Sequence, residues 1–324
     1  MDRILYIVVP CYNEEAVLPK TADRLLEKLA SLLERKMILP ESRILFVDDG
    51  SRDGTWEAIS DLCGKHREIC GIKLAHNKGH QKALFAGLMT AKEHADMVIT
   101  IDADLQDDID AIDKMIEKHL EGAEIVYGVR DKRDKDSFFK RTCARSFYRL
   151  MDMLGTETVY DHADFRLMGR DALEALSQYK EVNLFMRGIV PMLGFTTDVV
   201  YYERGERLAG YRKYTFRKSL SLAWDGITSF STAPIRLITI LGTAMFAISL
   251  FMMAYTVVRK LLGATVAGWS SLALSMWMIG GLVLLSMGIV GEYIGKIYLE
   301  TKARPRYIIE KEAGTHSDDE NKCS

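Results

Sequence analysis

Several familiar signals are absent from this sequence of 324 residues. It contains neither Gly-x-Gly-x-x-Gly nor the P-loop pattern of a glycine-rich turn before Lys-Ser/Thr, which argues against dinucleotide-binding and P-loop chemistry. Its five cysteines have neither metal-site spacing nor a paired framework, so we expect reduced thiols. The seven histidines form no ligand cluster. An excess of one charge is also missing, because the formal net charge is −2, and nothing suggests a nucleic-acid partner.

Apolar runs that end in acid-containing turns are present instead. Three of them cover residues 4–9, 44–47 and 97–101, and we expect each to form a buried strand. The chain thus opens directly into a strand, and no signal peptide is expected. Helical patterns lie between the runs; their apolar positions are Ala22, Leu25, Leu26, Leu29, Leu32 and Leu33, and then Trp56, Ile59 and Cys63. This alternation predicts an α/β fold with a parallel, doubly wound sheet.

Asp102-Ala103-Asp104 is the most informative of these strand ends. Two carboxylates at the carboxyl edge of a sheet lie where open α/β folds bind ligands, and a spacing of two sends both to the same side of an extended chain. Hard oxygen ligands suit Mg²⁺ or Mn²⁺ carrying a diphosphate. The alternative is helix capping, in which Asp107 or Asp108 caps the helical pattern that follows. The acidic pair alone does not decide between them.

Four motifs in a specific order extend this interpretation. They are Pro10-Cys11-Tyr12-Asn13-Glu14, Val47-Asp48-Asp49-Gly50-Ser51-Arg52-Asp53-Gly54-Thr55, Asn77-Lys78-Gly79-His80-Gln81-Lys82-Ala83-Leu84 and Asp102-Ala103-Asp104-Leu105-Gln106-Asp107. With them the chain resembles the GT-A fold glycosyltransferases of family 2. Later segments narrow the resemblance to polyprenyl-phosphate glycosyltransferases, similar to bactoprenol glucosyltransferases and dolichol-phosphate mannose synthases: Asp164-Phe165-Arg166-Leu167, Asn183-Leu184-Phe185-Met186-Arg187-Gly188 and Arg207-Leu208-Ala209-Gly210-Tyr211. The resemblance reaches about residue 310 and implies a GT-A (Rossmann-like), mostly parallel sheet.

The resemblance also implies a binding site for a nucleotide sugar. Its donor-site residues would be Pro10, Tyr12, Asn13, Glu14, Asp49, Lys78, Gly79, Asp102, Ala103, Asp104 and Gln106. Asp49 would accept a hydrogen bond from the base, and the Lys78-Gly79 turn would let the backbone approach closely. The implied cofactor is Mg²⁺ or Mn²⁺, held by Asp104 and Gln106, with Asp102 nearer the ribose or reaching the metal through water.

The implied acceptor is a phosphate, which is already largely ionised near neutral pH. A carboxylate would remove the last proton or position the nucleophile, with Asp164 the first choice and Asp161 the competitor. Arg141 and Arg145 share one helical stripe, which is either a solvated basic face or a site for the lipid phosphate, and we favour the second. The further acceptor-phosphate candidates are Arg130, Arg133 and Arg207.

The expected reaction is an inverting transfer of a hexose, glucose from UDP-glucose, to undecaprenyl or a related polyprenyl phosphate. The runner-up is mannosyl transfer from GDP-mannose. A non-catalytic membrane scaffold is the alternative from another class, and the intact donor-motif acids argue against it. A processive polysaccharide synthase is disfavoured because the sequence has no Gln-x-x-Arg-Trp motif.

Two long uncharged runs follow the motifs. They predict transmembrane helices at about 235–258 and 270–294, because each run approaches the ~20 residues that cross a bilayer as a helix. Lys and Arg gather on both sides of this hairpin, with only Arg259 and Lys260 in its link, so the catalytic region and both termini should be cytoplasmic at the inner membrane. The apolar stripe at 216–233 predicts an amphipathic helix in the membrane interface or, alternatively, a helix packed on the globular domain.

The domain organisation expected from these patterns has four parts. A cytoplasmic GT-A domain covers 1–215, the interfacial helix 216–233, the two transmembrane helices 234–298 and a cytoplasmic tail 299–324. The expected partners are a nucleotide sugar, a polyprenyl phosphate and the lipid bilayer. The relatives suggest a homo-oligomer.

Overall fold

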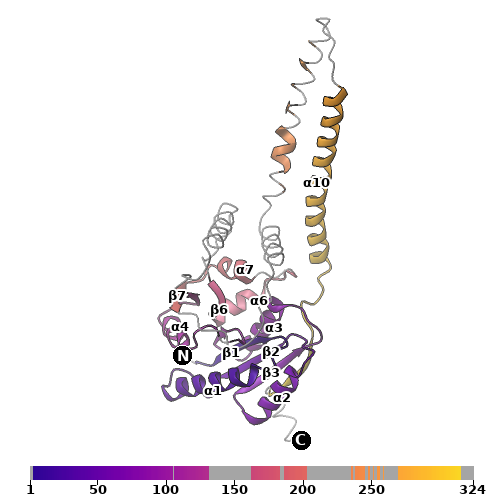
Figure 1. Ribbon diagram of the computed structural model, residues 1–324. Helices are drawn as coiled ribbons and strands as arrows, with labels where there is room; N and C mark the ends of the chain where they lie inside the picture. The colour runs from indigo at the N-terminus through magenta and orange to yellow at the C-terminus, as the bar shows by residue number, and fades with distance from the viewer. Residues whose placement is uncertain are drawn as a thin grey trace. The chain divides into compact units, whose positions relative to one another are not determined.

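The computed structural model describes residues 3–104, 106–130, 162–182, 186–202 and 269–314, together with parts of 235–258. The chain divides into two compact units (Figure 1). The first comprises Met1–Asp152, Glu157–Tyr214 and Arg304–Ser324, and the second comprises Met153–Thr156 and Thr215–Ala303. We describe each unit by itself.

The first unit is built on a mixed sheet. Its strands are β1 (Leu5–Cys11), β2 (Arg43–Asp48), β3 (Ile69–Leu74), β4 (Met97–Thr100), β5 (Ile125–Arg130), β6 (His162–Gly169), β7 (Thr197–Tyr202) and β8 (Ile309–Ala313). Their order in the sheet is β7-β5-β6-β4-β1-β2-β3-β8. The pairs among β1, β2, β3 and β4 are parallel, as is the pair of β5 with β7. The predicted α/β fold with a mostly parallel sheet is therefore confirmed.

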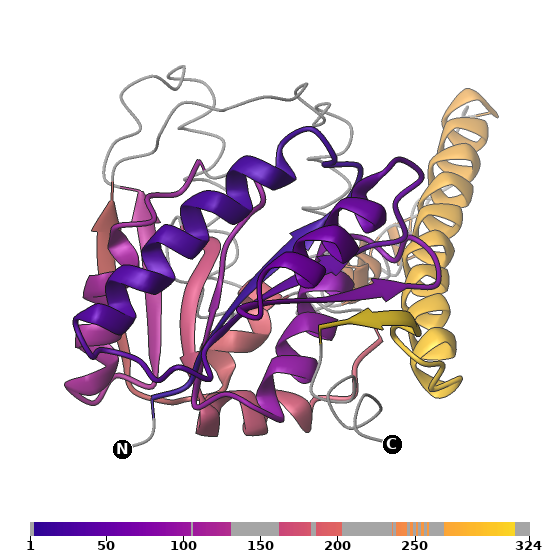
Figure 2. The ribbon, with the colours of Figure 1, turned by 90° about the horizontal axis from the view of Figure 1, so that it is seen from below.

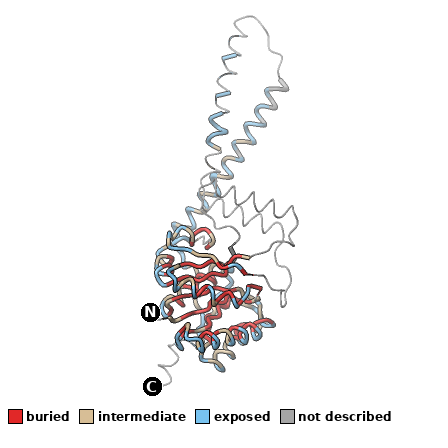
Figure 3. Tube along the Cα trace, turned by 90° about the vertical axis from the view of Figure 1, so that its left-hand side faces the viewer, coloured by how far each residue is buried: buried red, intermediate tan, exposed pale blue. Residues whose placement is uncertain are grey.

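Helices cover both faces of this sheet. They are α1 (Leu18–Glu34), α2 (Thr55–Lys65), α3 (His80–Lys92), α4 (Ala111–Leu120), α6 (Arg170–Ser177) and α7 (Met186–Met192). The predicted apolar face of the first helix is confirmed, since Leu25, Leu29 and Leu32 of α1 are fully buried. They share one core cluster with residues of α2, α4 and the strands below them, and α1 lies across the sheet in Figure 2. Buried positions, red in Figure 3, follow the strands and the inward faces of these helices.

Helix α3 packs closely on the opposite face of the sheet. A Cβ atom on Gly87 would come within 2.4 Å of Val8 and 2.8 Å of Val47, so only glycine permits this approach to β1 and β2. The close packing fixes the start of α3 beside the carboxyl ends of the parallel strands.

Strand β6 is one of the elements that the sequence patterns did not predict. It runs antiparallel to both β4 and β5, and Thr100 at the end of β4 pairs with Arg166. Because β6 runs in the opposite direction, its first residues extend beyond the carboxyl end of β4. Continuing the same register brings Asp164 opposite Asp102, so two motifs distant in the sequence meet at one edge of the sheet.

The chain returns to this unit near its end. Strand β8 pairs antiparallel with the edge strand β3, beside which it lies in Figure 2. Ahead of it, the Arg306 guanidinium lies 4.5 Å from the centre of the Phe85 ring and donates a hydrogen bond to the Tyr179 carbonyl. The pairing with β8 covers the β3 edge of the sheet, which would otherwise offer unpaired backbone groups.

The second unit contains α10 (Trp269–Thr301). Among the described residues, Met278–Thr301 is the single stretch of helix long and apolar enough to cross a membrane, with a hydropathy of 1.6 over its most apolar window. It overlaps the predicted second transmembrane helix at 270–294. The predicted first helix at 235–258 is described only in part, and the predicted interfacial helix at 216–233 lies outside the described residues. The two-helix hairpin therefore stays a prediction.

Candidate active site

The acidic residues after β4 form the first part of the site. Asp102 lies two residues beyond the strand with its side chain 44% exposed, and Asp104 accepts a hydrogen bond from the Gln106 backbone at 3.3 Å. Burial is the largest cause that raises the pKa of Asp102; with the lowering effect of His80 and the raising effects of Asp164, Asp107 and Asp104, the pKa reaches about 6. The neighbouring carboxylates thus add to an effect that burial dominates.

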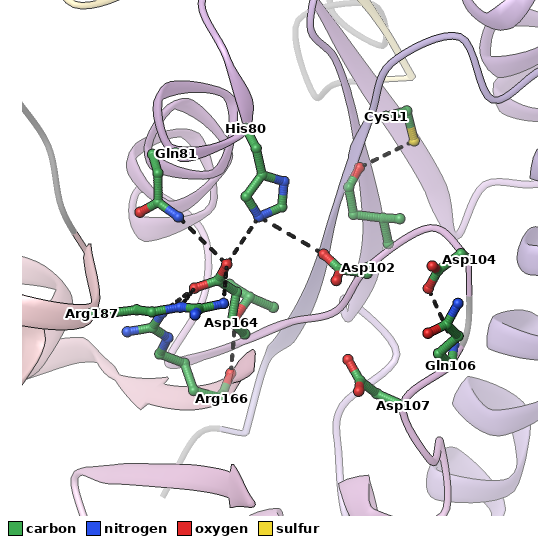
Figure 4. A network of polar contacts seen from close by, with 12 residues as sticks. Cys11, His80, Gln81, Asp102, Asp104, Gln106, Asp107, Asp164, Arg166 and Arg187 are labelled. Carbon is green, nitrogen blue, oxygen red and sulfur yellow. Dashed lines mark hydrogen bonds and ion pairs between the residues drawn. The ribbon is translucent and has the colours of Figure 1, made fainter. Parts of the chain in front are cut away.

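Asp164 is the centre of the second part, shown in Figure 4. One carboxylate oxygen, Oδ1, lies 3.0 Å from Arg166 Nη2 and 3.3 Å from Arg187 Nε. The other, Oδ2, lies 3.2 Å from His80 Nε2 and 3.4 Å from Gln81 Nε2. The same His80 nitrogen is 3.8 Å from Asp102 Oδ1, so the imidazole stands between the two acidic motifs. We call these five residues, His80, Gln81, Asp164, Arg166 and Arg187, the Asp164 cluster.

The surroundings of Asp164 favour its ionised form. Burial alone would raise its pKa, but the His80 hydrogen bond and the Arg187 and Arg166 guanidinium groups hold the pKa well below its usual range. Burial would lower the pKa of His80, whereas Asp164 and Asp102 raise it above its usual value. A carboxylate with so low a pKa is a weak proton acceptor, so this cluster is better suited to orienting charged groups than to removing a proton.

Arg130 belongs to a separate network at the end of β5. Its Nη2 donates to Asp107 Oδ1 at 3.2 Å, and its Nε donates to the Tyr202 hydroxyl at 3.3 Å. The Tyr202 hydroxyl in turn donates to Asp107 Oδ1 at 2.5 Å. Asp107 therefore does not cap α4; Asp108 instead accepts a hydrogen bond from the Asp110 backbone just before that helix.

Two loops at the ends of β1 and β2 are joined by hydrogen bonds. The Asn13 backbone donates to Ser51 Oγ at 2.9 Å, and Asn13 Oδ1 accepts from the Arg52 backbone at 2.9 Å. The Glu14 backbone donates to Thr55 Oγ1 at 3.0 Å. Asn13 has a φ of 54°, a left-handed conformation that asparagine tolerates better than most residues. The first two motifs thus form one platform beside Pro10 and Tyr12.

Asp49 joins a third motif to this platform. Its two carboxylate oxygens accept hydrogen bonds from the Lys78 backbone at 2.7 Å and the Gly79 backbone at 2.8 Å. Gly79 has a φ of 88°, which explains the need for glycine at this turn. Both oxygens of Asp49 are thus occupied by the backbone of the Lys78-Gly79 turn, and the predicted contact of Asp49 with a nucleotide base stays a prediction.

The described residues include only part of the predicted site. It joins Asp102 to Asp164 through His80, and Asp49 to Lys78 and Gly79. The candidates that lie outside the described residues are Asp161, Arg133, Arg141, Arg145 and Arg207. The sequence reasoning assigned no role to His80, Gln81, Arg166, Arg187 or Tyr202. The first four stand inside quoted motifs, but they come together only in the folded structure, from α3, β6 and α7.

The oxygen groups after β4 fit a hard divalent cation by their chemistry. Asp102, Asp104 and Gln106 each offer a side-chain oxygen, and the charges of Asp164, Asp107 and Asp104 repel the charge of Asp102, a repulsion that a cation would offset. Within the described part of the chain, no three His, Cys, Asp or Glu side chains form a ready-made metal cluster. Beside phosphates, Mg²⁺ is usually held through one or two carboxylates, with the remaining positions filled by substrate oxygens and water.

Comparison with known proteins agrees with the motifs. Residues 6–177 match the glycosyl transferase family 2 model. The chain is 54% identical to the uncharacterized glycosyltransferase YkoT of Bacillus subtilis, over 95% of this chain and 91% of that protein. It is 40% identical to the bactoprenol glucosyl transferase of Shigella phage SfV, over 94% of this chain and 98% of that protein.

Among solved structures, the mannosyltransferase PcManGT of Pyrobaculum calidifontis matches with a TM-score of 0.47 at 16% identity, covering 92% of this chain and 85% of that one. The family model spans more than half of the sequence, and the two bacterial and phage relatives span nearly all of it. The chain therefore belongs to glycosyl transferase family 2.

Proposed function

We propose that this glycosyltransferase moves glucose from UDP-glucose to undecaprenyl or a related polyprenyl phosphate, with inversion at the sugar carbon. The observation that carries the proposal is the meeting of Asp102 with the Asp164 cluster at one edge of the sheet, joined by His80. An acidic pair suited to a cation-bound diphosphate thus lies beside arginines suited to a phosphate. The similarity to a phage bactoprenol glucosyl transferase supports the choice of sugar and acceptor.

The donor would bind across the three joined loops. In this proposal Pro10, Tyr12, Asn13 and Glu14 line the nucleotide pocket, with Lys78 and Gly79 opposite them. Asp102, Asp104 and Gln106 hold Mg²⁺ or Mn²⁺, with Ala103 leaving room between the two acids. The cation, when bound, neutralises the charge that develops on the departing diphosphate.

The acceptor phosphate would be held by arginine side chains. The side chains of Arg130 and Arg187 are 29% and 40% exposed. Each is held by an ion pair with an aspartate and still leaves part of its guanidinium accessible to a ligand. A phosphate monoester has a second pKa of about 6, so the enzyme needs little help in removing its last proton. We therefore assign Asp164 the second of its two predicted roles, orienting the cations that position the nucleophile. Arg133, Arg141, Arg145, Arg207 and Asp161 stay candidates at this end of the site.

Membrane attachment completes the proposal, because the acceptor is a lipid. We propose two transmembrane helices at about 235–258 and 270–294, preceded by an interfacial helix at 216–233, with the GT-A domain and both termini in the cytoplasm. Exposed apolar side chains of the second unit support this arrangement. Leu272 and Met276 of α10 are each more than half exposed, and so is Phe251 within the predicted first helix. The resemblance to its relatives suggests a homo-oligomer in the inner membrane.

The test is transfer of a radiolabelled sugar into lipid. Full-length protein in detergent is incubated with undecaprenyl phosphate, Mg²⁺ or Mn²⁺, and a panel of labelled nucleotide sugars that includes UDP-glucose and GDP-mannose. We expect label from UDP-glucose to enter the lipid phase and to depend on the divalent cation. If only label from GDP-mannose entered the lipid phase, GDP-mannose would replace UDP-glucose as the donor. If no label from any donor entered the lipid phase, the proposed polyprenyl-phosphate acceptor would be refuted.

A further inference from the structure

Tyr202, Asp107 and Arg130 form a closed triangle at the ends of two neighbouring strands. Strands β5 and β7 are parallel, and Arg130 pairs with Tyr202 in their register. The Tyr202 hydroxyl donates to Asp107 Oδ1 and accepts from Arg130 Nε, while Arg130 Nη2 reaches the same Asp107 oxygen. The Tyr202 ring is held by an edge-on contact with Phe165, with centroids 5.4 Å apart. Each side chain is therefore fixed by the other two.

Burial divides the triangle into two supports and one reaching group. The side chain of Asp107 is 2% exposed and Tyr202 is 4% exposed, whereas the side chain of Arg130 is 29% exposed. Burial would lower the pKa of Arg130, but Asp107 and Tyr202 raise it above its usual value, so the guanidinium stays charged. A long arginine side chain loses considerable rotamer freedom when it is held at two points. That loss has already occurred in the folded protein, before any ligand arrives.

Asp107 also belongs to the acidic loop after β4. It directly follows Gln106 and stands three positions after Asp104, two of the residues that we expect to hold the cation. The position of Arg130 is thus tied to the loop that carries the donor-binding acids.

We propose that Tyr202 and Asp107 are positioning residues that hold the Arg130 guanidinium in place for the phosphate of the acceptor. This inference rests on the proposed function, in which Arg130 is an acceptor-phosphate ligand. Tyr202 and Asp107 act through Arg130 and are too deeply buried to reach the phosphate themselves. The competing explanation is that the triangle only stabilises the β5–β7 edge of the sheet.

Tyr202→Phe separates the two explanations, because it removes the hydroxyl and keeps the ring that packs on Phe165. In the full-length enzyme we expect the KM for undecaprenyl phosphate to rise about three- to tenfold, the effect of one neutral hydrogen bond, with kcat and UDP-glucose affinity unchanged. Tyr201→Phe is the matched control: it makes the same change one residue earlier on β7, where the side chain is 63% exposed. Tyr201→Phe should leave the KM for undecaprenyl phosphate, kcat and UDP-glucose affinity unchanged.

A double-mutant cycle with Arg130→Lys supplies a readout that a structural role would not move. Lysine lacks Nε and the planar fork, so Tyr202→Phe should change the acceptor KM less than about twofold in that background. Binding of farnesyl phosphate to the metal-free protein, measured by calorimetry in EDTA, should follow the same pattern. Thermal melting of all four proteins records any loss of stability separately.

The outcomes distinguish this inference from the proposed function. The positioning role is refuted if Tyr202→Phe raises the acceptor KM by the same factor in the wild-type and the Arg130→Lys backgrounds. It is also refuted if Tyr202→Phe lowers only the melting temperature. The transferase activity stands in both cases. If the wild-type enzyme transfers no sugar to undecaprenyl phosphate from any donor, the proposed function fails and this inference fails with it.

Discussion

Replacing Asp164 by asparagine tests the charge balance at the centre of the site. Arg166 is fully buried, and its Nε atom has no hydrogen-bond partner within the described part of the chain, so Asp164 is its main compensation. Removing one partner of a buried ion pair costs about 3–5 kcal/mol, and asparagine keeps the volume and one acceptor oxygen. We therefore expect Asp164→Asn to lower the free energy of unfolding by about 3 kcal/mol, which lowers Tm by about 6–12 °C.

The assay pairs thermal melting with transfer of labelled glucose to undecaprenyl phosphate. Activity should fall by about a hundredfold or more, because the arginines lose their fixed orientation. Asp198→Asn is the matched control, since Asp198 forms an ion pair with Lys118 at the surface and is 43% exposed. That change should cost less than about 0.5 kcal/mol and leave transfer intact.

A second substitution separates stability from function. In the variant carrying both Asp164→Asn and Arg166→Met, the unpaired buried charge is gone, so most of the lost Tm should return. Transfer should stay low, because Arg187 and His80 still lack their carboxylate. Equal melting temperatures for Asp164→Asn and Asp198→Asn, or normal transfer by Asp164→Asn, would refute this account of the cluster.

The pH dependence of the same pair follows from the direction of the pKa shift. The folded pKa of Asp164 lies well below its usual value, so its stabilising contribution is fully present above the unfolded value of about 3.9. It is lost as the pH falls through the lower, folded pKa. The difference in Tm between wild type and Asp164→Asn should therefore be largest between about pH 5 and pH 6 and shrink below about pH 4. It should also shrink as the pH rises past neutrality, because His80, whose pKa Asp164 raises, then loses its proton.

Three further predictions concern the metal, the membrane and the acceptor. Asp104→Asn should abolish transfer without lowering Tm. Asp110→Asn, at a side chain that is 84% exposed, is the control and should leave transfer intact. Near-normal turnover of Asp104→Asn at limiting Mg²⁺ would show that Asp104 is not a metal ligand. A membrane-impermeant thiol reagent added to intact cells should label cysteines introduced at 263–268 and not one introduced at Lys302, and the reverse pattern would invert the topology. Changing Arg141 and Arg145 together to alanine should weaken undecaprenyl phosphate use tenfold or more at unchanged UDP-glucose affinity, and a loss of donor affinity instead would return the stripe to a solvated basic face.

The elements that could be predicted from the sequence are those whose burial leaves a local pattern. The run at 97–101 is short and continuously apolar, as in a strand buried on both faces, and the structure has β4 there. Leu25, Leu29 and Leu32 recur with the helical period, and the structure has α1 there. The acid-containing turns were visible because polar residues follow buried strands abruptly. Their meeting at one edge then follows from parallel strand pairing alone.

Strand β8 left no such pattern. Its residues Glu310, Lys311 and Glu312 are all exposed in the sheet, so neither face shows the alternation that marks a half-buried strand. Its place in the sheet depends on pairing with β3, far earlier in the chain. Arg166 was concealed for a different reason, since a fully buried arginine in a strand contradicts the usual distribution of charge and is tolerated only because Asp164 faces it.

The register between β4 and β6 decides whether the site exists. Asp164 and Phe165 point to opposite faces of the sheet, so a slip of one residue would bury Asp164 in the core beside α4 and leave Asp102 without its partner. Thr100 opposes such a slip: its hydroxyl, fully buried, donates to the Asp164 carbonyl and lies 3.4 Å from the Arg166 carbonyl. A single buried side chain at the end of β4 thus helps hold β6 in the one register that brings the acidic pair, His80 and the arginines together.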